Sequence, residues 1–230
     1  MSITALRIIT KPTERVLTLA EAKSHLRVTH SAEDAHILSL VLAASDWAGT
    51  YMRRHLVTTI VDLAFDCFPD SGRNYYIGYG AQSVHFDHVT VANRVMNKTS
   101  RDRGIFLPGG NVTAVESISY IDEAGVPQTL SGPTSTVPGT DYQEDLTDDE
   151  WPMILPPIDL GWPSTQGGGV NVVAVRYTAG WAKADIPESI RHAVRFKLAD
   201  LYTVRAPSNQ KTAGVRAAED LLDPFVVTLM

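Results

Sequence analysis

The chain has 230 residues, of which 44% are hydrophobic and 20% are charged. This length fits one large domain or two small ones, and this composition supports a substantial core, which excludes a long repeat array and global disorder. The formal net charge of -6 disfavours a surface that grips nucleic acid by neutralising its phosphates. The only cysteine, Cys67, cannot form an intramolecular disulfide, so a cytosolic origin is favoured.

Neither a signal peptide nor a membrane span is predicted. Residues 1–11 lack the basic region followed by an apolar one that a signal peptide requires. The longest apolar stretch, residues 37–44, is far shorter than the roughly 20 residues that cross a bilayer. The sequence therefore predicts no membrane partner.

Two helices are predicted near the N-terminus. Thr18 and Glu21 have the spacing of a capping box, in which each side chain satisfies a free backbone N–H at a helix start, and this helix is predicted to reach about Val28. Ser31 is predicted to cap a longer helix over residues 32–54. The apolar residues of the longer helix gather on one face: Ile37, Leu40, Val41, Ala44, Trp47, Ala48, Tyr51 and Met52.

The middle of the chain, residues 57–181, has the features of β-structure. Short runs of β-favouring residues alternate with Gly, Pro and Asp clusters and predict strands at residues 58–65, 83–91, 115–121 and 170–177. The sequence Asp-Glu-Ala-Gly at residues 122–125 lies between two such runs and predicts a hairpin turn.

Two further helices are predicted near the C-terminus. Pro187 suits the first turn of a helix, and Asp185 is available as its cap. An apolar face then continues to about Val204, with Ile190, Ala193, Val194, Leu198, Leu201 and Tyr202. A last amphipathic helix, residues 215–222, is stopped by Pro224.

Together these patterns predict an α+β fold. A frame of four helices from both chain ends, residues 1–57 and 183–230, holds a β-rich insertion, residues 58–182, between its second and third helices. The insertion is expected to contain antiparallel strands and hairpins, and residues 1–230 are expected to form a single discontinuous unit. The insertion carries 6 basic and 15 acidic side chains, so the negative charge of the chain belongs to it.

The acidic side chains are densest at residues 141–150: Asp141, Glu144, Asp145, Asp148, Asp149 and Glu150. Such a run is ordinarily a solvated loop. It lacks the alternating register of a calcium loop, and a glycosidase pair, for which Glu144 and Asp148 are the residues to test, needs two carboxylates about 5 to 9 Å apart.

Motifs that carry other chemistry are missing from the sequence. It has no phosphate-binding G-x-x-x-x-G-K-[ST] loop, no complete dinucleotide fingerprint and no G-x-S-x-G elbow. His85 and His88 are predicted to point to opposite faces of a strand, which disfavours a shared metal. The sequence therefore predicts no catalytic residues, no metal and no cofactor.

Several segments, taken in order, resemble one family. They are residues 17–28, the acidic Glu33-Asp34 step, the long helix to Arg54, residues 58–68, Ile-Phe-Leu-Pro at 105–108, residues 115–125, Asp141-Tyr142, residues 175–181 followed by 186–193, and residues 217–225. In this order and spacing the chain resembles bacteriophage head-tail connector proteins, also called adaptors, which are found in gene transfer agents as well. Residues 71–103 are longer than the corresponding family segment, and the ending lacks the usual Arg or Tyr after the proline.

The resemblance implies a structural, non-enzymatic virion protein that is made in the bacterial host cytoplasm and located at the head-tail junction. Such proteins form a ring, typically of twelve copies, beneath the portal protein. The ring extends the DNA channel, lets DNA pass without specific binding, and offers a docking surface to a stopper or tail-terminator protein. An acidic surface suits a conduit, because phosphate contacts from a basic one would retain the duplex.

Three groups of residues become candidates for these contacts. The ring interface is predicted to include Leu38 and Leu42, which fall outside the apolar face of the long helix and alternatively pack on the chain's own sheet, together with Arg53, Arg54, Arg191 and Arg195. Portal binding is assigned to the C-terminal Leu221, Leu222, Pro224, Phe225, Val226 and Val227, for which packing on their own subunit is the alternative. The acidic residues of the 141–150 run are predicted to face the channel or its tail-side rim.

A rival function is a small β-rich carbohydrate- or ligand-binding module of a virion or cell surface. Its motivation is a set of aromatic side chains able to stack on sugars: Trp151, Trp162, Trp181, Tyr75, Tyr76 and Tyr79. Tryptophans in a core are the commoner arrangement. Glycan binding by a monomer favours this rival, whereas a closed ring favours the adaptor.

Overall fold

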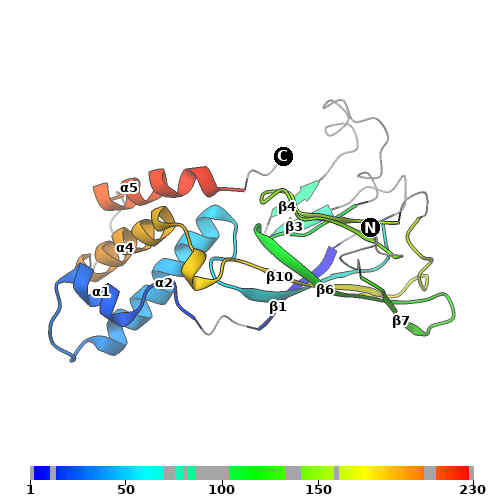
Figure 1. The fold of residues 1–230 in the computed structure, drawn as a ribbon, viewed down its shortest axis with the longest axis horizontal. Helices are drawn as coiled ribbons and strands as arrows, with labels where there is room; N and C mark the ends of the chain where they lie inside the picture. The colour runs from blue at the N-terminus through cyan, green and yellow to red at the C-terminus, as the bar shows by residue number, and fades with distance from the viewer. Residues whose placement is uncertain are drawn as a thin grey trace. The chain divides into compact units, whose positions relative to one another are not determined.

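The computed structural model describes residues 3–10, 14–69, 76–79, 82–85, 104–132, 141–157, 161–204 and 211–227 (Figure 1). Its contacts divide the chain into two compact units. Unit 1 comprises Met1–Lys11, Thr59–Ala179 and Thr228–Met230, and unit 2 comprises Pro12–Thr58 and Gly180–Val227. No helix within the described ranges is long and apolar enough to cross a membrane.

Unit 1 is built from antiparallel strands. Its main sheet has the order β1-β2-β10-β6-β7, formed by Ile3–Thr10, Thr59–Phe65, Val173–Ala179, Val112–Ile121 and Pro127–Leu130. A second sheet has the order β5-β9-β8, formed by Ile105–Phe106, Met153–Leu155 and Gln143–Asp145. The strands β3, Tyr76–Tyr79, and β4, Gln82–His85, pair with each other.

Burial alternates along β2, which shows how the main sheet forms its core. Val61, Leu63 and Phe65 are buried and lie opposite Tyr177, Val175 and Val173 of β10. In a strand, alternate side chains point to opposite faces, so these residues share one face of the sheet. They pack in one cluster with Ile105, Leu107, Tyr142 and Ile154 of the second sheet and its flanks.

Unit 2 consists of helices. They are α1 (Leu19–Leu26), α2 (Asp34–Met52), α4 (Glu188–Thr203) and α5 (Ala213–Leu222), with 3-10 turns η2 (Lys183–Asp185) and η3 (Asp223–Phe225). In Figure 1, α4 runs between α2 and α5. The face of α2 predicted from the sequence supplies the core: Ile37, Val41, Ala44, Ala48 and Met52 are buried, and Leu40, Trp47 and Tyr51 pack against them.

Two locally encoded features are confirmed. Thr18 accepts a hydrogen bond from the Glu21 backbone N–H, and the Glu21 carboxylate accepts one from the Thr18 N–H at 2.7 Å, which completes the capping box. The turn at residues 122–125 joins β6 to β7, and the Asp122 carboxylate accepts from the backbone N–H groups of Ala124 and Val126. These hydrogen bonds lower the pKa of Asp122.

Other expectations need correction. Residues 3–10 form β1 and pair with β2, so the helical part begins after them and not at residue 1. Ser31 does not cap α2, whose N-cap is Glu33 without a side-chain cap bond. Asp185 lies in η2, and Pro187 itself is the N-cap of α4. The predicted strand at 83–91 is described only as far as His85, within β4.

The mixed α+β class is confirmed by the four helices and the antiparallel sheets of the described residues. The exact frame and insertion arrangement, and the folding of residues 1–230 as one discontinuous unit, stay predictions. We propose that the two units unfold together, because the chain passes between them at residues 11–12, 58–59, 179–180 and 227–228.

Candidate functional site

The C-terminal segment, residues 223–227, is held by the last turn of α2. The Val227 N–H donates to the Met52 carbonyl at 3.0 Å, and the guanidinium groups of Arg53 and Arg54 donate to the Val227 and Phe225 carbonyls at 3.0 and 2.7 Å. The Tyr51 hydroxyl donates to the Asp223 carboxylate at 2.6 Å. We call the four residues Tyr51, Met52, Arg53 and Arg54 the tail clasp.

The Tyr51–Asp223 bond has an electrostatic consequence. The hydrogen bond to Asp223, a smaller desolvation contribution and the nearby acidic charges together raise the pKa of the Tyr51 hydroxyl to about 12. The phenol therefore stays protonated, and remains a donor to Asp223, throughout the neutral range.

The side chains predicted to bind a portal differ in their exposure. Leu222 and Val227 are buried, and Leu221, Phe225 and Val226 are partly buried against the helices of unit 2. Pro224 is exposed. In this chain the residues therefore pack on their own subunit, which was the alternative interpretation of their apolar character.

The residues predicted for a ring interface are likewise divided. Leu42 is exposed over 46% of its surface and Leu38 is half-buried, both on α2. Arg53 and Arg54 belong to the tail clasp and donate to carbonyls of the C-terminal segment. The tail clasp and the C-terminal segment are far from each other in the sequence, so no local sequence pattern predicts their contact.

Arg191 and Arg195 form ion pairs within unit 2. Arg191 pairs with Glu21 and, at 3.3 Å, with Glu188, while Arg195 lies 3.6 Å from the Glu188 carboxylate. Burial alone raises the pKa of Glu21, but hydrogen bonds from Thr18 and the charge and hydrogen bond of Arg191 outweigh it, so the pKa is lowered. Glu21 thus connects the start of α1 to α4.

The acidic run at residues 141–150 covers strand β8 and its connection to β9. Asp148 accepts hydrogen bonds from the backbone N–H groups of Glu150 and Trp151, and Asp145 accepts one from the Thr147 hydroxyl. Asp141 accepts from the Ser131 N–H, and the Asn111 N–H donates to the carbonyl of Asp149. Desolvation raises the pKa of Glu144. The carboxylates thus organise a turn as well as contributing charge.

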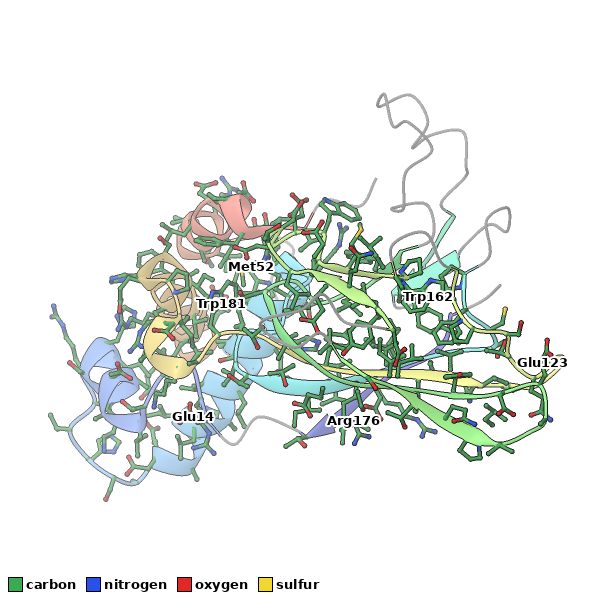
Figure 2. The ribbon with its side chains drawn as sticks, turned by 45° about the vertical axis from the view of Figure 1, so that its right-hand side comes forward. Glu14, Met52, Glu123, Trp162, Arg176 and Trp181 are labelled. Atoms are coloured by element: carbon green, nitrogen blue, oxygen red, sulfur yellow. The ribbon has the colours of Figure 1, made fainter. Side chains whose placement is uncertain are left out.

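The outward face of the main sheet carries a cross-strand ion pair. Arg176 of β10 donates twice to Asp62 of β2, at 2.6 and 2.7 Å, and these two residues lie opposite each other in the register. The hydrogen bonds to Asp62, followed by its charge, raise the pKa of Arg176. Figure 2 shows Arg176 on the face of the sheet away from Trp162.

The tryptophans behind the rival function take part in packing. Trp162 stacks on Phe68 with ring centroids 4.8 Å apart, and Trp151 lies 5.1 Å from the Phe106 ring. Trp181 packs against the core of unit 2. Tyr75 lies outside the described residues, and the side chains of Tyr76 and Tyr79 are not described.

Groups of three or more histidine, cysteine, aspartate or glutamate side chains able to hold a metal do not occur among the residues that the structure describes. His88 lies outside them. The described features that remain for a contact role are the tail clasp, the α2 surface around Leu42 and the acidic turn at residues 141–150.

His55 follows the tail clasp and suggests a pH dependence of stability. Its Nε2 atom is buried without a hydrogen-bond partner in the described part of the chain, and burial lowers the pKa of the imidazole. Below the ordinary pKa of 6.5, the unfolded chain therefore binds this proton more readily than the folded chain, and the free energy of unfolding falls with falling pH.

We expect the wild-type free energy of unfolding to decrease between pH 7 and pH 5, and His55→Gln to make that decrease shallower. Urea unfolding at both pH values measures it. His36→Gln, at an exposed position of α2, is the control and should leave the slope nearly unchanged. Equal slopes for wild type and His55→Gln contradict the assignment.

Comparison with known proteins connects this geometry to a family. Residues 16–100 match the family model of phage gp6-like head-tail connector proteins. No curated protein matches the chain.

Solved structures extend the similarity to the whole chain. A chain in the neck of an empty GTA particle computed with C6 symmetry has a TM-score of 0.66 and 20% identity, over 99% of this chain and 97% of that one. A chain in the virion of a native gene transfer agent (GTA) particle gives 0.66 and 20%, over 98% and 96%. A neck chain of the native GTA particle computed with C12 symmetry gives 0.63 and 18%, over 99% and 97%.

The neck chains share the fold of this protein at low identity, and the sequence match independently covers α1, α2 and β2. Residues 16–100 of this chain are therefore similar to the phage gp6-like head-tail connector family, which is structural and non-enzymatic, and the chain as a whole shares the fold of the GTA neck chains.

Proposed function

We propose that this protein is a head-tail adaptor, a structural component of the neck of a phage virion or gene transfer agent. The observation that carries the proposal is the agreement between the connector match at residues 16–100 and a fold shared over 99% of the chain with a GTA neck chain. Synthesis in the cytoplasm of a bacterial host follows from that role.

In this role the protein forms a ring, of twelve copies in the particle, beneath the portal protein. The C6 and C12 symmetry of the similar neck structures supports a ring. A ring needs a head-to-tail interface, in which two different surfaces of each subunit meet. The exposed Leu42 with Leu38, and the four arginines predicted from the sequence, are proposed to lie in it: Arg53, Arg54, Arg191 and Arg195.

The ring extends the DNA channel and provides the docking surface for a stopper or tail-terminator protein. We propose that the acidic turn at residues 141–150 faces the channel or its tail-side rim. Its charges repel phosphates, so the duplex passes without being held. In an image reconstruction of the assembled ring, a position of this turn on the outer circumference contradicts the assignment.

Ring formation is tested by Leu42→Glu. A charge at an exposed apolar position is costly only where a partner buries it, so we expect closed rings to be largely lost, while the monomer keeps its melting temperature within a few degrees. Negative-stain images of the protein assembled on portal particles measure ring closure.

Val126→Glu is the matched control, because Val126 is 49% exposed in the β6–β7 hairpin and Leu42 is 46% exposed. The control is expected to form rings. Normal rings from Leu42→Glu remove α2 from the interface, and absence of rings from the wild-type protein on portal particles argues against the adaptor function itself.

A further inference from the structure

Hydrogen bonds from the end of α2 hold the C-terminal segment, residues 223–227. Three consecutive clasp residues, Met52, Arg53 and Arg54, bond its main chain, and Tyr51 bonds the side chain of Asp223. Within and next to this segment, the Val226 N–H also donates to the Asp223 carbonyl, and the Asp223 N–H donates to the Glu219 carbonyl at the end of α5.

The hydrogen bonds of the tail clasp differ in strength. Two of them join a guanidinium group to a carbonyl oxygen, and such charge-assisted bonds are stronger than neutral ones. They involve the main chain, so they hold the segment independently of its side chains. Phe225 and Val226 are half-buried against the helices, and Val227 is buried.

This arrangement conflicts with simple docking by the same side chains. Of the six residues proposed to contact the portal, Leu222 and Val227 have less than a tenth of their surface exposed. A partner cannot contact the Val227 side chain until residues 223–227 move, and Leu222, which belongs to α5, stays buried while α5 stays in place. Residues 223–227 follow the end of α5, so they can move while α5 stays in place.

We propose that the tail clasp is a reversible intramolecular contact that competes with portal binding. It keeps residues 223–227 on the chain's own helices, and docking of this segment to the portal requires the clasp to open. The proposal rests on the adaptor function proposed above. The equilibrium between clasped and open forms sets the apparent affinity for the portal. If the portal binds only the open form, its apparent affinity is its affinity for that form multiplied by the fraction of chains that are open.

Hydrogen exchange tests the holding contact in the full-length protein without a partner. In Arg53→Ala/Arg54→Ala we expect the Val227 amide to exchange roughly tenfold faster, since losing a charge-assisted bond shifts a local opening equilibrium by about that factor. Amides of β2 and β10 should keep their wild-type exchange. Unchanged exchange at Val227 overturns the clasp.

Arg27→Ala is the matched control. Arg27 is the C-cap of α1 with φ of 59°, as Arg53 is the C-cap of α2 with φ of 56°, so both substitutions make the same change at a left-handed cap. Arg27→Ala should leave Val227 protected. Equally rapid exchange in this control shows that the effect is not specific to the clasp and overturns the proposal.

Portal binding tests the consequence. The double variant is expected to bind portal rings more tightly than wild type, by about the factor measured in exchange. Weaker or unchanged binding overturns the proposal, because it shows that the segment docks while the clasp is closed. Failure of both proteins to bind portal rings refutes portal docking, while the exchange experiment still judges the holding contact.

Discussion

Gly180→Ala is expected to lower the free energy of unfolding by about 3 kcal/mol or more. Gly180 has φ of +98°, a conformation that L-residues rarely adopt. A Cβ atom there would lie 2.5 Å from the Val57 carbonyl oxygen and 2.7 Å from its carbon. The main chain of Val57 cannot move aside as a flexible side chain would. The cost of the unfavourable φ and the cost of the steric overlap with Val57 therefore add.

The position explains why the overlap is not relieved by a small movement. Trp181 bridges to Val57, and the Thr58 N–H donates to the Trp181 carbonyl at 3.0 Å, which fixes the two segments side by side. Calorimetry is expected to show a melting temperature lower by roughly 10 °C, at about 2 to 4 °C for each kcal/mol, and one transition if both units unfold together.

Gly161→Ala is the control for this experiment. A Cβ atom at Gly161 meets nothing within 4 Å, and its φ is not in the left-handed region. Its melting temperature should stay close to that of wild type. A Gly180→Ala protein as stable as the Gly161→Ala protein shows that the contact with Val57 does not constrain the chain as described.

Leu198→Ala is expected to destabilise the protein by about 3 kcal/mol, within the range of roughly 2 to 5 for buried leucines. Leu198 lies on α4, is fully buried, and belongs to the core that α2 and α5 share with it. The substitution removes apolar contacts and leaves a cavity. Urea unfolding followed by circular dichroism measures the loss as a lower midpoint.

Leu42→Ala provides the comparison at an exposed position, also in a helix of unit 2. Leu42 is 46% exposed and forms no part of the core, so we expect a loss below about 1 kcal/mol in the isolated protein. Equal losses for the two substitutions contradict the burial pattern of unit 2. The same pair separates stability from assembly, because only Leu42 is proposed to contact a neighbouring subunit.

The amino-acid sequence by itself determined the features whose partners are close along the chain. The capping box needs only Thr18 and Glu21, three residues apart, and the apolar face of α2 repeats within each turn. The hairpin turn at residues 122–125 follows from Asp122 and Gly125, whose φ is +80°. The resemblance to connectors rests on such local elements in their order.

The tertiary structure alone decided the features that pair distant residues. Residues 3–10 become a strand because β2, about fifty residues later, offers its edge, and Arg53 and Arg54 find carbonyls 174 and 171 positions away. Position 180 must likewise be a glycine because the main chain of the distant Val57 lies against it. No period or spacing along the sequence encodes such contacts, because they depend on how separate elements pack. For this reason the sequence did not predict that Arg53 and Arg54 bond the chain's own C-terminal segment.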